Sequence, residues 1–193
     1  MPHRAIRVVA VGAALSLLTA CGAEAAKPTP PQSSSPPSTA SSPKVPAPLP
    51  TTDLLNDPCN VLNAAETAQI GLAYPGRTVQ ETLRSCAWTS SGSKQNFVHI
   101  TALPQNDHGI SDIYDMKAQQ AYFEPTSIEG YPAVFADTQD GRSSGTCTLW
   151  VGVTNQLAAS VIPQIGTGRN KTNPCGVAQQ VATVMIKHLK APA

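Results

Sequence analysis

The order of hydrophobic and polar positions divides this chain into three parts. Residues 5–20 form a mostly apolar run whose one charged residue is Arg7, and the segment after it, up to Thr52, is rich in Pro, Ser and Thr. From Asp53 onward, hydrophobic residues recur at the spacings typical of helices and strands. Residues 53–193 are therefore predicted to fold as a single domain, and their number is enough for one hydrophobic core.

The most regular pattern lies near the C-terminus and predicts a helix over Pro174–Lys190. Hydrophobic positions recur there at steps of three and four residues, which puts them on one face of the helix. This face consists of Val177, Val181, Val184, Met185 and His188. Asn173 precedes the proline and is expected to cap the helix, because its side chain can accept a hydrogen bond from the first turn.

Two further helices are expected in the domain. Asp57 and Pro58 form the same kind of helix start, with Asp as the cap and Pro in the first helical position, and Gly71 is a suitable end. A shorter helix is predicted over residues 109–120, with Asp107 as its cap. Both segments carry hydrophobic residues along one side.

Five segments have the alternation, or the β-branched and aromatic content, of strands. They are the extended run that follows a turn at residues 74–76 and ends at Trp88, then Gln95–Leu103, Glu129–Ala136, Thr146–Val153 and Leu157–Ile162. Together with the helices they predict an α+β fold. We expect an antiparallel sheet of about five strands, with the N- and C-terminal helices packed on one face.

The N-terminal segment has the features of a secretory signal. A basic start that extends to Arg7 is followed by an uncharged run up to Ala20, which is too short to cross the ~30 Å of hydrocarbon in a membrane. The basic or partly basic residues are His3, Arg4 and Arg7. Residues 1–20 are therefore expected to direct export as a signal peptide.

The end of this signal resembles the lipobox of bacterial lipoproteins. The matching residues are Leu18, Thr19, Ala20 and Cys21. The resemblance implies cleavage before Cys21 and diacylation of its sulfur with chains such as palmitate. Two or more acyl chains hold a protein on a membrane where one chain does not. The alternative is an ordinary signal peptide that is cleaved near Ala20 and leaves Cys21 unmodified.

Residues 21–52 are predicted to form a disordered tether that begins at the lipidated cysteine. Nine prolines alternate with Ser, Thr and Ala between Gly22 and Thr52. This composition cannot bury enough apolar area to offset the entropy of ordering, and it favours extended polyproline II geometry. Ser and Thr beside Pro also make O-glycosylation possible, and an unmodified spacer is the alternative.

The charge of the domain limits the classes of partner that it is expected to bind. Residues 53–193 contain nine Lys and Arg against eleven Asp and Glu, a formal charge of −2, without a basic cluster. Nucleic acids and anionic lipid surfaces attract basic patches, so neither is expected as a partner. The sequence gives no reason to expect a cofactor.

Four cysteines remain once Cys21 is assigned to lipid. An even number of cysteines in an exported domain favours two disulfides, and four cysteines allow three pairings. The first predicted helix and the extended run after it bring Cys86 back to the level of Cys59. The second half of the domain brings Cys175 near Cys147 in the same way. The pairs Cys59–Cys86 and Cys147–Cys175 are favoured, and the other two pairings stay open.

These motifs together resemble a family of exported actinobacterial lipoproteins, known as domain of unknown function 3558. Besides the lipobox and the tether, the shared points are Asp57-Pro58-Cys59, Cys86-Ala87-Trp88, Gly130-Tyr131-Pro132-Ala133, Cys147 and Asn173-Pro174-Cys175 before a terminal helix. The resemblance covers essentially the whole folded domain. It implies a location at the cell surface and a non-enzymatic protein, and it supplies no catalytic or binding residue.

One string and three histidines are candidates for catalysis or metal binding. Residues 141–145 read Gly-Arg-Ser-Ser-Gly and match the G-x-S-x-G string of serine hydrolases. That nucleophile elbow needs a helix after it, whereas a strand with Cys147 follows here, so a hairpin loop is the favoured interpretation. His99, His108 and His188 lack the spacing of metal ligands, and no metal site is expected.

Acidic and aromatic residues offer two weaker candidates. Asp107, Asp112 and Asp115 cluster at a helix start, where the helix dipole explains the first two without a cation, and the three lack the spacing of a calcium loop. Trp88 and Trp150 are interpreted as core or sheet-face residues rather than as a platform for a sugar. Trp150 points away from its strand neighbours, so it needs cover from a helix or forms an exposed contact surface.

The best candidate ligand site is the loop before the last helix. It contains Gly166, Gly168, Arg169 and Lys171. Flexible glycines and two cations thus lie ahead of the free amides of a helix N-terminus, which suits an anion or a sugar acid. A solvated loop without a ligand is the alternative.

These observations predict a membrane-anchored lipoprotein on the outer face of the cytoplasmic membrane. Its domain is expected to bind an envelope protein or a small ligand without transforming it, and the protein is not expected to be an enzyme. Two alternatives are an envelope hydrolase with an unrecognised active site and a carrier of a lipid or another hydrophobe. A deep cleft with ionisable groups would favour the hydrolase, and an apolar interior cavity would favour the carrier.

Overall fold

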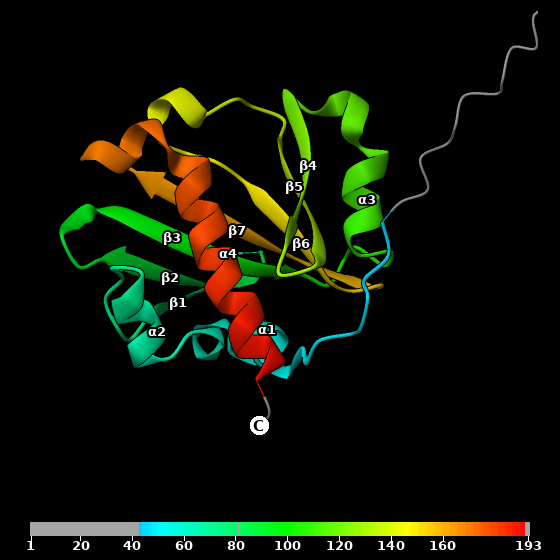
Figure 1. Cartoon of the computed structure of the whole chain (residues 1–193), viewed down its shortest axis with the longest axis horizontal. Coiled ribbons are helices and arrows are strands. Elements are labelled where there is room, and N and C mark those ends of the chain that lie inside the picture. The colour runs from blue at the N-terminus through cyan, green and yellow to red at the C-terminus, as the bar shows by residue number, and fades with distance from the viewer. Residues whose placement is uncertain (1–42, 81, 192–193) are drawn as a thin grey trace, which may run out of the picture. The chain divides into compact units, whose positions relative to one another are not determined.

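An antiparallel sheet with helices packed against it makes up the α+β fold of this protein (Figure 1). The computed structural model describes residues 43–80 and 82–191. The seven strands within these residues are β1 (Arg77–Gln80), β2 (Arg84–Ser90), β3 (Ser93–Leu103), β4 (Tyr122–Ile128), β5 (Tyr131–Asp137), β6 (Leu149–Thr154) and β7 (Leu157–Ile165). Their spatial order, β1-β2-β3-β7-β6-β5-β4, joins two meanders through the β3–β7 pair.

The α+β class and the antiparallel sheet are confirmed, but the expected number of about five strands was wrong. The extended run that ends at Trp88 divides into β1 and β2, which pair as a hairpin from Arg77 opposite Ala87 to Gln80 opposite Arg84. The sequence pattern also missed β4. This edge strand has Pro125 and polar residues at its centre, where an outer strand tolerates them, so it lacks the alternation of a half-buried strand.

Helix α4 spans Pro174–Lys190, as predicted from the sequence. The side chain of Asn173 accepts a hydrogen bond from the backbone N–H of Gly176 at 3.3 Å, so the expected cap is confirmed. The helix contacts β7, β6 and β4. The shorter helices are α1 (Thr52–Asn56), η1 (Pro58–Val61), α2 (Ala64–Gln69), α3 (Ile110–Asp115), η2 (Lys117–Gln119), η3 (Arg142–Ser144) and η4 (Arg169–Thr172).

Two short helices replace the single helix expected between Asp57 and Gly71. Asp57 accepts a hydrogen bond from the backbone N–H of Cys59 at 3.3 Å, as a cap should, but the helix that it starts is η1. Asn63 then opens α2 with a capping box. Its side chain accepts from the Glu66 N–H at 3.0 Å, and the Glu66 carboxylate accepts from the Asn63 N–H at 2.8 Å. This box requires an extended backbone at Asn63, which interrupts a continuous helix.

The helix predicted over residues 109–120 is shorter, and Asp107 is not its cap. α3 ends at Asp115, and its N-cap is Gly109, which provides no side chain. Asp112 accepts a hydrogen bond from the backbone N–H of His108 at 3.1 Å instead. Gly109 has a φ of 57°, a conformation that favours glycine, and a Cβ there would lie 3.0 Å from the backbone nitrogen of Leu157.

Residues before Asp53, the boundary expected from the sequence, also pack on the folded domain. Val45 and Leu49 are 8% and 7% exposed and belong to the main core cluster. The backbone N–H of Leu49 donates to the carbonyl of Val153 at 3.0 Å, and that of Val45 donates to the side chain of Asn155 at 3.1 Å. Two apolar side chains and two hydrogen bonds thus fix the last part of the Pro-rich segment on the domain.

Hydrophobic side chains pack on both faces of the sheet. The larger cluster contains alternate strand residues such as Ala133 together with the buried residues of α4. A smaller cluster joins Ile110 and Ile113 of α3 to Val134 and Ala136. Ala133 and Val134 are neighbours in β5, so the two clusters lie on opposite faces of the sheet.

Two disulfides close the domain, and they are the two pairs that the sequence favoured. Cys59–Cys86 joins η1 to β2 and spans 27 residues. Cys147–Cys175 joins the segment before β6 to the first turn of α4 and spans 28 residues. Each closed loop is expected to stabilise the fold by about 3 kcal/mol, because it reduces the entropy of the unfolded chain.

Candidate functional site

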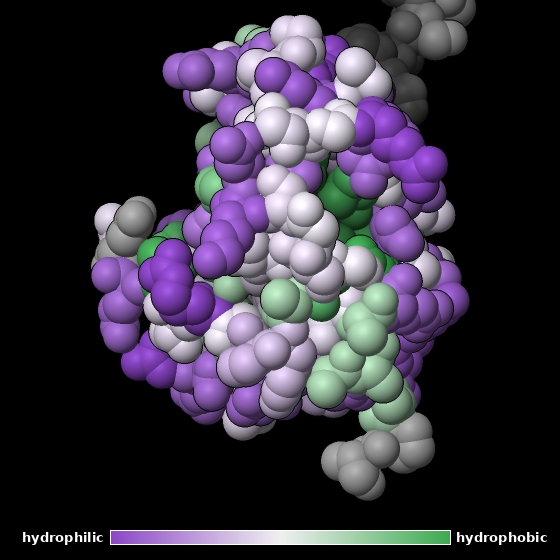
Figure 2. Space-filling model, turned by 90° about the vertical axis from the view of Figure 1, so that its left-hand side faces the viewer, coloured by the Kyte–Doolittle hydropathy of each residue, from purple (hydrophilic) through white to green (hydrophobic). Residues whose placement is uncertain are grey.

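A groove of about 390 Å³ lies between α2 and α4, and we call it the α2–α4 groove. It is lined by Glu66, Gln69, Ile70, Gly176, Gln179, Gln180, Thr183, Val184 and Lys187. The residues from α4 recur at steps of three and four, so they form one face of that helix. Figure 2 views the side of the protein on which α2 lies and shows hydrophobic surface recessed between hydrophilic side chains.

The floor of the α2–α4 groove is hydrophobic. Ile70, the C-terminal cap of α2, is partly buried and packs against the main core cluster. Val184 belongs to this cluster and is 8% exposed. The groove therefore reaches the edge of the core, where apolar surface of a ligand would be buried with a gain of about 25 cal/mol per Å².

Most of the rim consists of uncharged polar side chains. These are Gln69 from α2 and Gln179, Gln180 and Thr183 from α4. The three glutamines are exposed and Thr183 is half-buried. Each amide offers two donors and an acceptor, and the hydroxyl can act in either role. The rim can thus pair with a ligand that presents both donors and acceptors.

A side-chain pair joins the two helices beside the groove. Nδ1 of His188 lies 2.8 Å from Oε2 of Glu66, and the two side chains are 25% and 22% exposed. The same Glu66 oxygen accepts the backbone hydrogen bond from Asn63 that opens α2. The carboxylate of Glu66 is therefore held by both helices.

The other ionisable residue of the lining also has a partner. Nζ of Lys187 lies 3.6 Å from Oε1 of Glu129, at the turn between β4 and β5. Nζ of Lys190, one turn further along α4, donates to the backbone carbonyl of Glu129 at 2.7 Å. Glu66 and Lys187, the two acidic or basic residues of the groove lining, thus each have a partner outside it.

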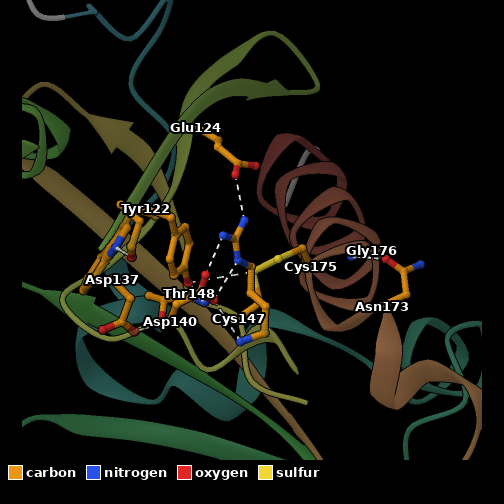
Figure 3. Close-up of a disulfide and its surroundings, with 12 residues drawn as sticks. Tyr122, Glu124, Asp137, Asp140, Cys147, Thr148, Asn173, Cys175 and Gly176 are labelled. Atoms are coloured by element: carbon orange, nitrogen blue, oxygen red, sulfur yellow. Dashed lines mark hydrogen bonds and ion pairs between the residues drawn. A yellow bond between two sulfur atoms is a disulfide. The ribbon is translucent and has the colours of Figure 1, made fainter. Parts of the chain in front are cut away.

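A second polar cluster surrounds the Cys147–Cys175 disulfide (Figure 3). The Arg142 guanidinium donates to the Asp140 carboxylate at 2.8 and 2.7 Å and to Glu124 at 2.7 Å. It also covers the ring of Tyr122, at 4.3 Å from the centroid. The hydrogen bonds from Arg142 lower the pKa of Asp140 to about 2, and its bonds to Asp140 and Glu124 raise the pKa of Arg142.

The same cluster extends into the sheet. The Tyr122 hydroxyl accepts a hydrogen bond from the backbone N–H of Thr148 at 3.0 Å, and burial raises the pKa of Tyr122. The Thr148 hydroxyl donates to the carboxylate of Asp137 at 2.5 Å. Since the cation of this cluster is already bound by two carboxylates, the arrangement suits a structural clamp at the end of the sheet.

The loop expected to bind an anion lies on the surface, and none of its residues lines the groove. Its residues Gly166, Gly168, Arg169 and Lys171 are all exposed. The side chain of Asn96 holds the loop, because it donates to the carbonyl of Thr167 and accepts from its N–H, both at 3.0 Å. A shallow hollow of about 290 Å³ adjoins this loop. An anion site there stays a prediction.

The three histidines lie in different surroundings. The ring of His99 in β3 meets that of Phe97 edge-on at 5.3 Å. His108 contacts Asp112 at 3.0 Å, and His188 contacts Glu66. Within residues 43–80 and 82–191, no group of three or more His, Cys, Asp or Glu is placed to hold a metal ion.

The other candidates from the sequence, residues 141–145 and the two tryptophans, have structural roles. Residues 141–145 form a turn around η3, in which the Ser144 hydroxyl donates to the carbonyl of Gly141 at 2.8 Å, and strand β6 follows. This turn is not a nucleophile elbow. Trp88 is fully buried. Trp150 packs against the cluster of α3, and its indole donates to the carbonyl of Ala136 at 2.8 Å, so the helix supplies the cover that this residue needs.

The sequence pattern alone did not predict the α2–α4 groove. One signal was available, because Asn63 and Glu66 have the spacing of a capping box and thus place a helix start at Asn63. A second was the stripe of Gln180, Thr183 and Lys187 beside the apolar face of α4. Neither signal states that α2 lies along this stripe, since their contact joins segments more than 100 residues apart.

Fold and groove define a class: a disulfide-bonded α+β domain with a surface groove between two helices. A family model described as a protein of unknown function (DUF3558) matches residues 16–188, so the chain belongs to that family. No curated protein and no solved structure matches the chain. Among the residues that the structure describes, none forms a helix long and apolar enough to cross a membrane. The signal, Cys21 and most of the expected tether lie outside these residues.

Proposed function

We propose that this protein is an exported lipoprotein whose domain binds a ligand in the α2–α4 groove without transforming it. One observation carries the binding role: a hydrophobic floor of Ile70 and Val184, at the edge of the core, lies beneath a rim of mostly uncharged polar side chains. Concave sites of a few hundred Å³, mostly apolar with a few polar groups, are the usual ligand sites of proteins.

The sequence supports the export and the anchor in this proposal. Residues 1–20 read as a signal peptide, and Leu18–Cys21 resembles a lipobox, so Cys21 would carry the lipid on the outer face of the cytoplasmic membrane. The two disulfides are consistent with an oxidising compartment outside the cytosol. The segment between Cys21 and the domain would then separate the domain from the membrane.

The packing of the interior favours surface binding over carriage of a hydrophobe. Trp88, Leu149 and Met185 are fully buried and fill the main core cluster, which includes residues of both α4 and the sheet. Leu54 of α1 belongs to this cluster as well, and we infer from it that the N- and C-terminal helices cover the same face. A carrier would need an apolar cavity at this place.

Site-specific photo-crosslinking in the producing cells tests the binding role. A benzophenone side chain replaces Thr183 inside the groove or, as a matched control, the exposed Gln156 in the turn between β6 and β7. We expect one defined adduct from position 183, of a mass that identifies the ligand, and none from position 156. Equal adducts from both positions, or no adduct from position 183, would contradict the proposed role of the groove.

A further inference from the structure

We infer that the ligand of the α2–α4 groove is an extended segment of a partner polypeptide, with one hydrophobic side chain placed on Ile70 and Val184. The inference rests on the proposed binding role of the groove and names the class of its ligand. Three properties of the lining support it: its length, its hydrogen-bonding groups, and the partners that its two ionisable side chains already have.

The length of the groove fits a short peptide. Lys187 follows Gly176 by eleven positions along α4, and both line the groove. At ~1.5 Å per helical residue, this distance is about 17 Å. An extended chain rises ~3.3 Å per residue, so about five residues of a partner would lie along the groove.

The hydrogen-bonding groups of the rim match a peptide backbone. An extended segment presents N–H donors and C=O acceptors in alternation, and each must find a partner when it leaves water. Gln69 on one side and Gln179 and Gln180 on the other carry both kinds of group at the end of flexible side chains. Thr183 adds a hydroxyl lower in the groove. Such a rim can pair with either backbone group in either chain direction.

The charges and ring content of the lining favour a peptide over other ligands. Glu66 is paired with His188, and Lys187 lies near Glu129, so both ionisable side chains of the lining already have a partner of their own. The nine lining residues include no aromatic ring, the group on which proteins commonly stack a sugar. A peptide needs neither an unpaired charge nor an aromatic ring, because its apolar side chain would lie on the floor and its neutral backbone along the rim.

Methyl NMR on the mature full chain, held in lipid nanodiscs with its anchor, tests the inference. The probe is the blocked pentapeptide acetyl-Gly-Gly-Leu-Gly-Gly-amide. We expect the methyl signals of Ile70 and Val184 to shift, with a dissociation constant on the order of 1 mM, while those of the buried Ile128 stay in place. The same peptide with Gly in place of Leu should bind at least about tenfold more weakly, since it buries no side chain.

Two substitutions sharpen this test. Gln180→Ala removes one rim amide and should weaken binding of the leucine peptide about fivefold, which corresponds to one hydrogen bond. Gln156→Ala, the same change at an exposed site outside the groove, should leave binding unchanged. Both variants are expected to fold, because each changes an exposed side chain.

Three results would overturn the peptide assignment. The first is the absence of shifts at Ile70 and Val184 up to about 10 mM peptide. The second is equal binding of the leucine and glycine peptides. The third is a shift of these methyls by chitotriose, a neutral sugar, in place of the peptide. This last result would leave the groove as a ligand site and change only the class of its ligand, so the two proposals fail separately.

Discussion

Glu66 and His188 are 122 positions apart in the chain, yet Oε2 of one lies 2.8 Å from Nδ1 of the other. Glu66 belongs to the first turn of α2 and His188 to the last turn of α4. The pair therefore holds together the two helices whose facing sides line the α2–α4 groove. Both side chains are about three-quarters buried, so solvent screens their interaction less than that of an exposed pair.

A double-mutant cycle with Glu66→Ala and His188→Ala should reveal this coupling. We expect an interaction free energy of about 1 kcal/mol, because the pair is hydrogen-bonded and largely buried. Glu66→Ala also removes the hydrogen bond with which Glu66 caps α2. This loss is the same with and without His188, so it cancels in the interaction free energy. His108 and Asp112 are the control, since this pair also lies at 3.0 Å but His108 is 78% exposed. Its coupling should be about 0.3 kcal/mol, and equal values for the two cycles would contradict the account.

Leu49 tests whether the last part of the Pro-rich segment belongs to the domain. Its side chain is 7% exposed in the main core cluster, so Leu49→Ala should lower the free energy of unfolding by about 2–4 kcal/mol. Leu55→Ala removes the same atoms from a side chain that is 41% exposed and should cost about 0.5 kcal/mol or less. Urea denaturation of both variants measures the difference. Similar midpoints would show that residues 43–51 do not contribute to the fold.

Gly76 packs against both the first disulfide and the buried tryptophan. A Cβ at this position would lie 2.6 Å from Nε1 of Trp88 and would also meet the sulfur of Cys86. Gly76→Ala should therefore destabilise the protein by about 1–3 kcal/mol through overpacking. The matched change Gly92→Ala meets no atom closer than 4.0 Å and should have little effect. Thermal unfolding compares them, and an unchanged melting temperature for Gly76→Ala is the contrary result.

The carboxyl group of Asp140 should titrate at an unusually low pH. Hydrogen bonds from Arg142 lower its pKa from 3.8 to about 2, and NMR of the side-chain carboxyl carbon measures the midpoint. The folded value is the lower one, so the stabilisation from this pair is complete above pH 3.8 and is lost as the pH falls through about 2. Arg142→Gln should raise the midpoint toward its ordinary value. Arg169→Gln removes a cation from another loop and should leave it unchanged.

Local signals explain what the sequence could predict. Asn173, Pro174 and the hydrophobic face of α4 lie within one segment, so the pattern determines the helix and its start. The two disulfides could be favoured because each joins a helix start to a segment in or next to a strand that returns from the same region, which needs no knowledge of distant contacts. The α+β class follows from the same kind of local evidence.

Contacts between distant segments explain what the sequence could not predict. β4 lies at the sheet edge, and its pairing with β5 rather than its own residues makes it a strand. Val45 and Leu49 lie in a Pro-rich sequence that is typical of a spacer. Only the hydrogen bonds of their backbone N–H groups to Asn155 and Val153 show that they belong to the domain. The α2–α4 groove likewise exists only because Glu66 and its neighbours lie along α4. The glycines and cations of residues 166–171 predicted a ligand site in that loop, but these residues do not line the groove.

The most direct test of the account as a whole is the intact mass of the processed protein, purified from the membranes of the cells that make it. We predict a chain that begins at Cys21, carries the added mass of its acyl chains, and has no free thiol at the other four cysteines. Cys21→Ser should abolish this added mass and release the protein from the membrane fraction. An unmodified amino terminus on the wild-type protein would contradict the anchored, outward-facing binding domain proposed for this chain.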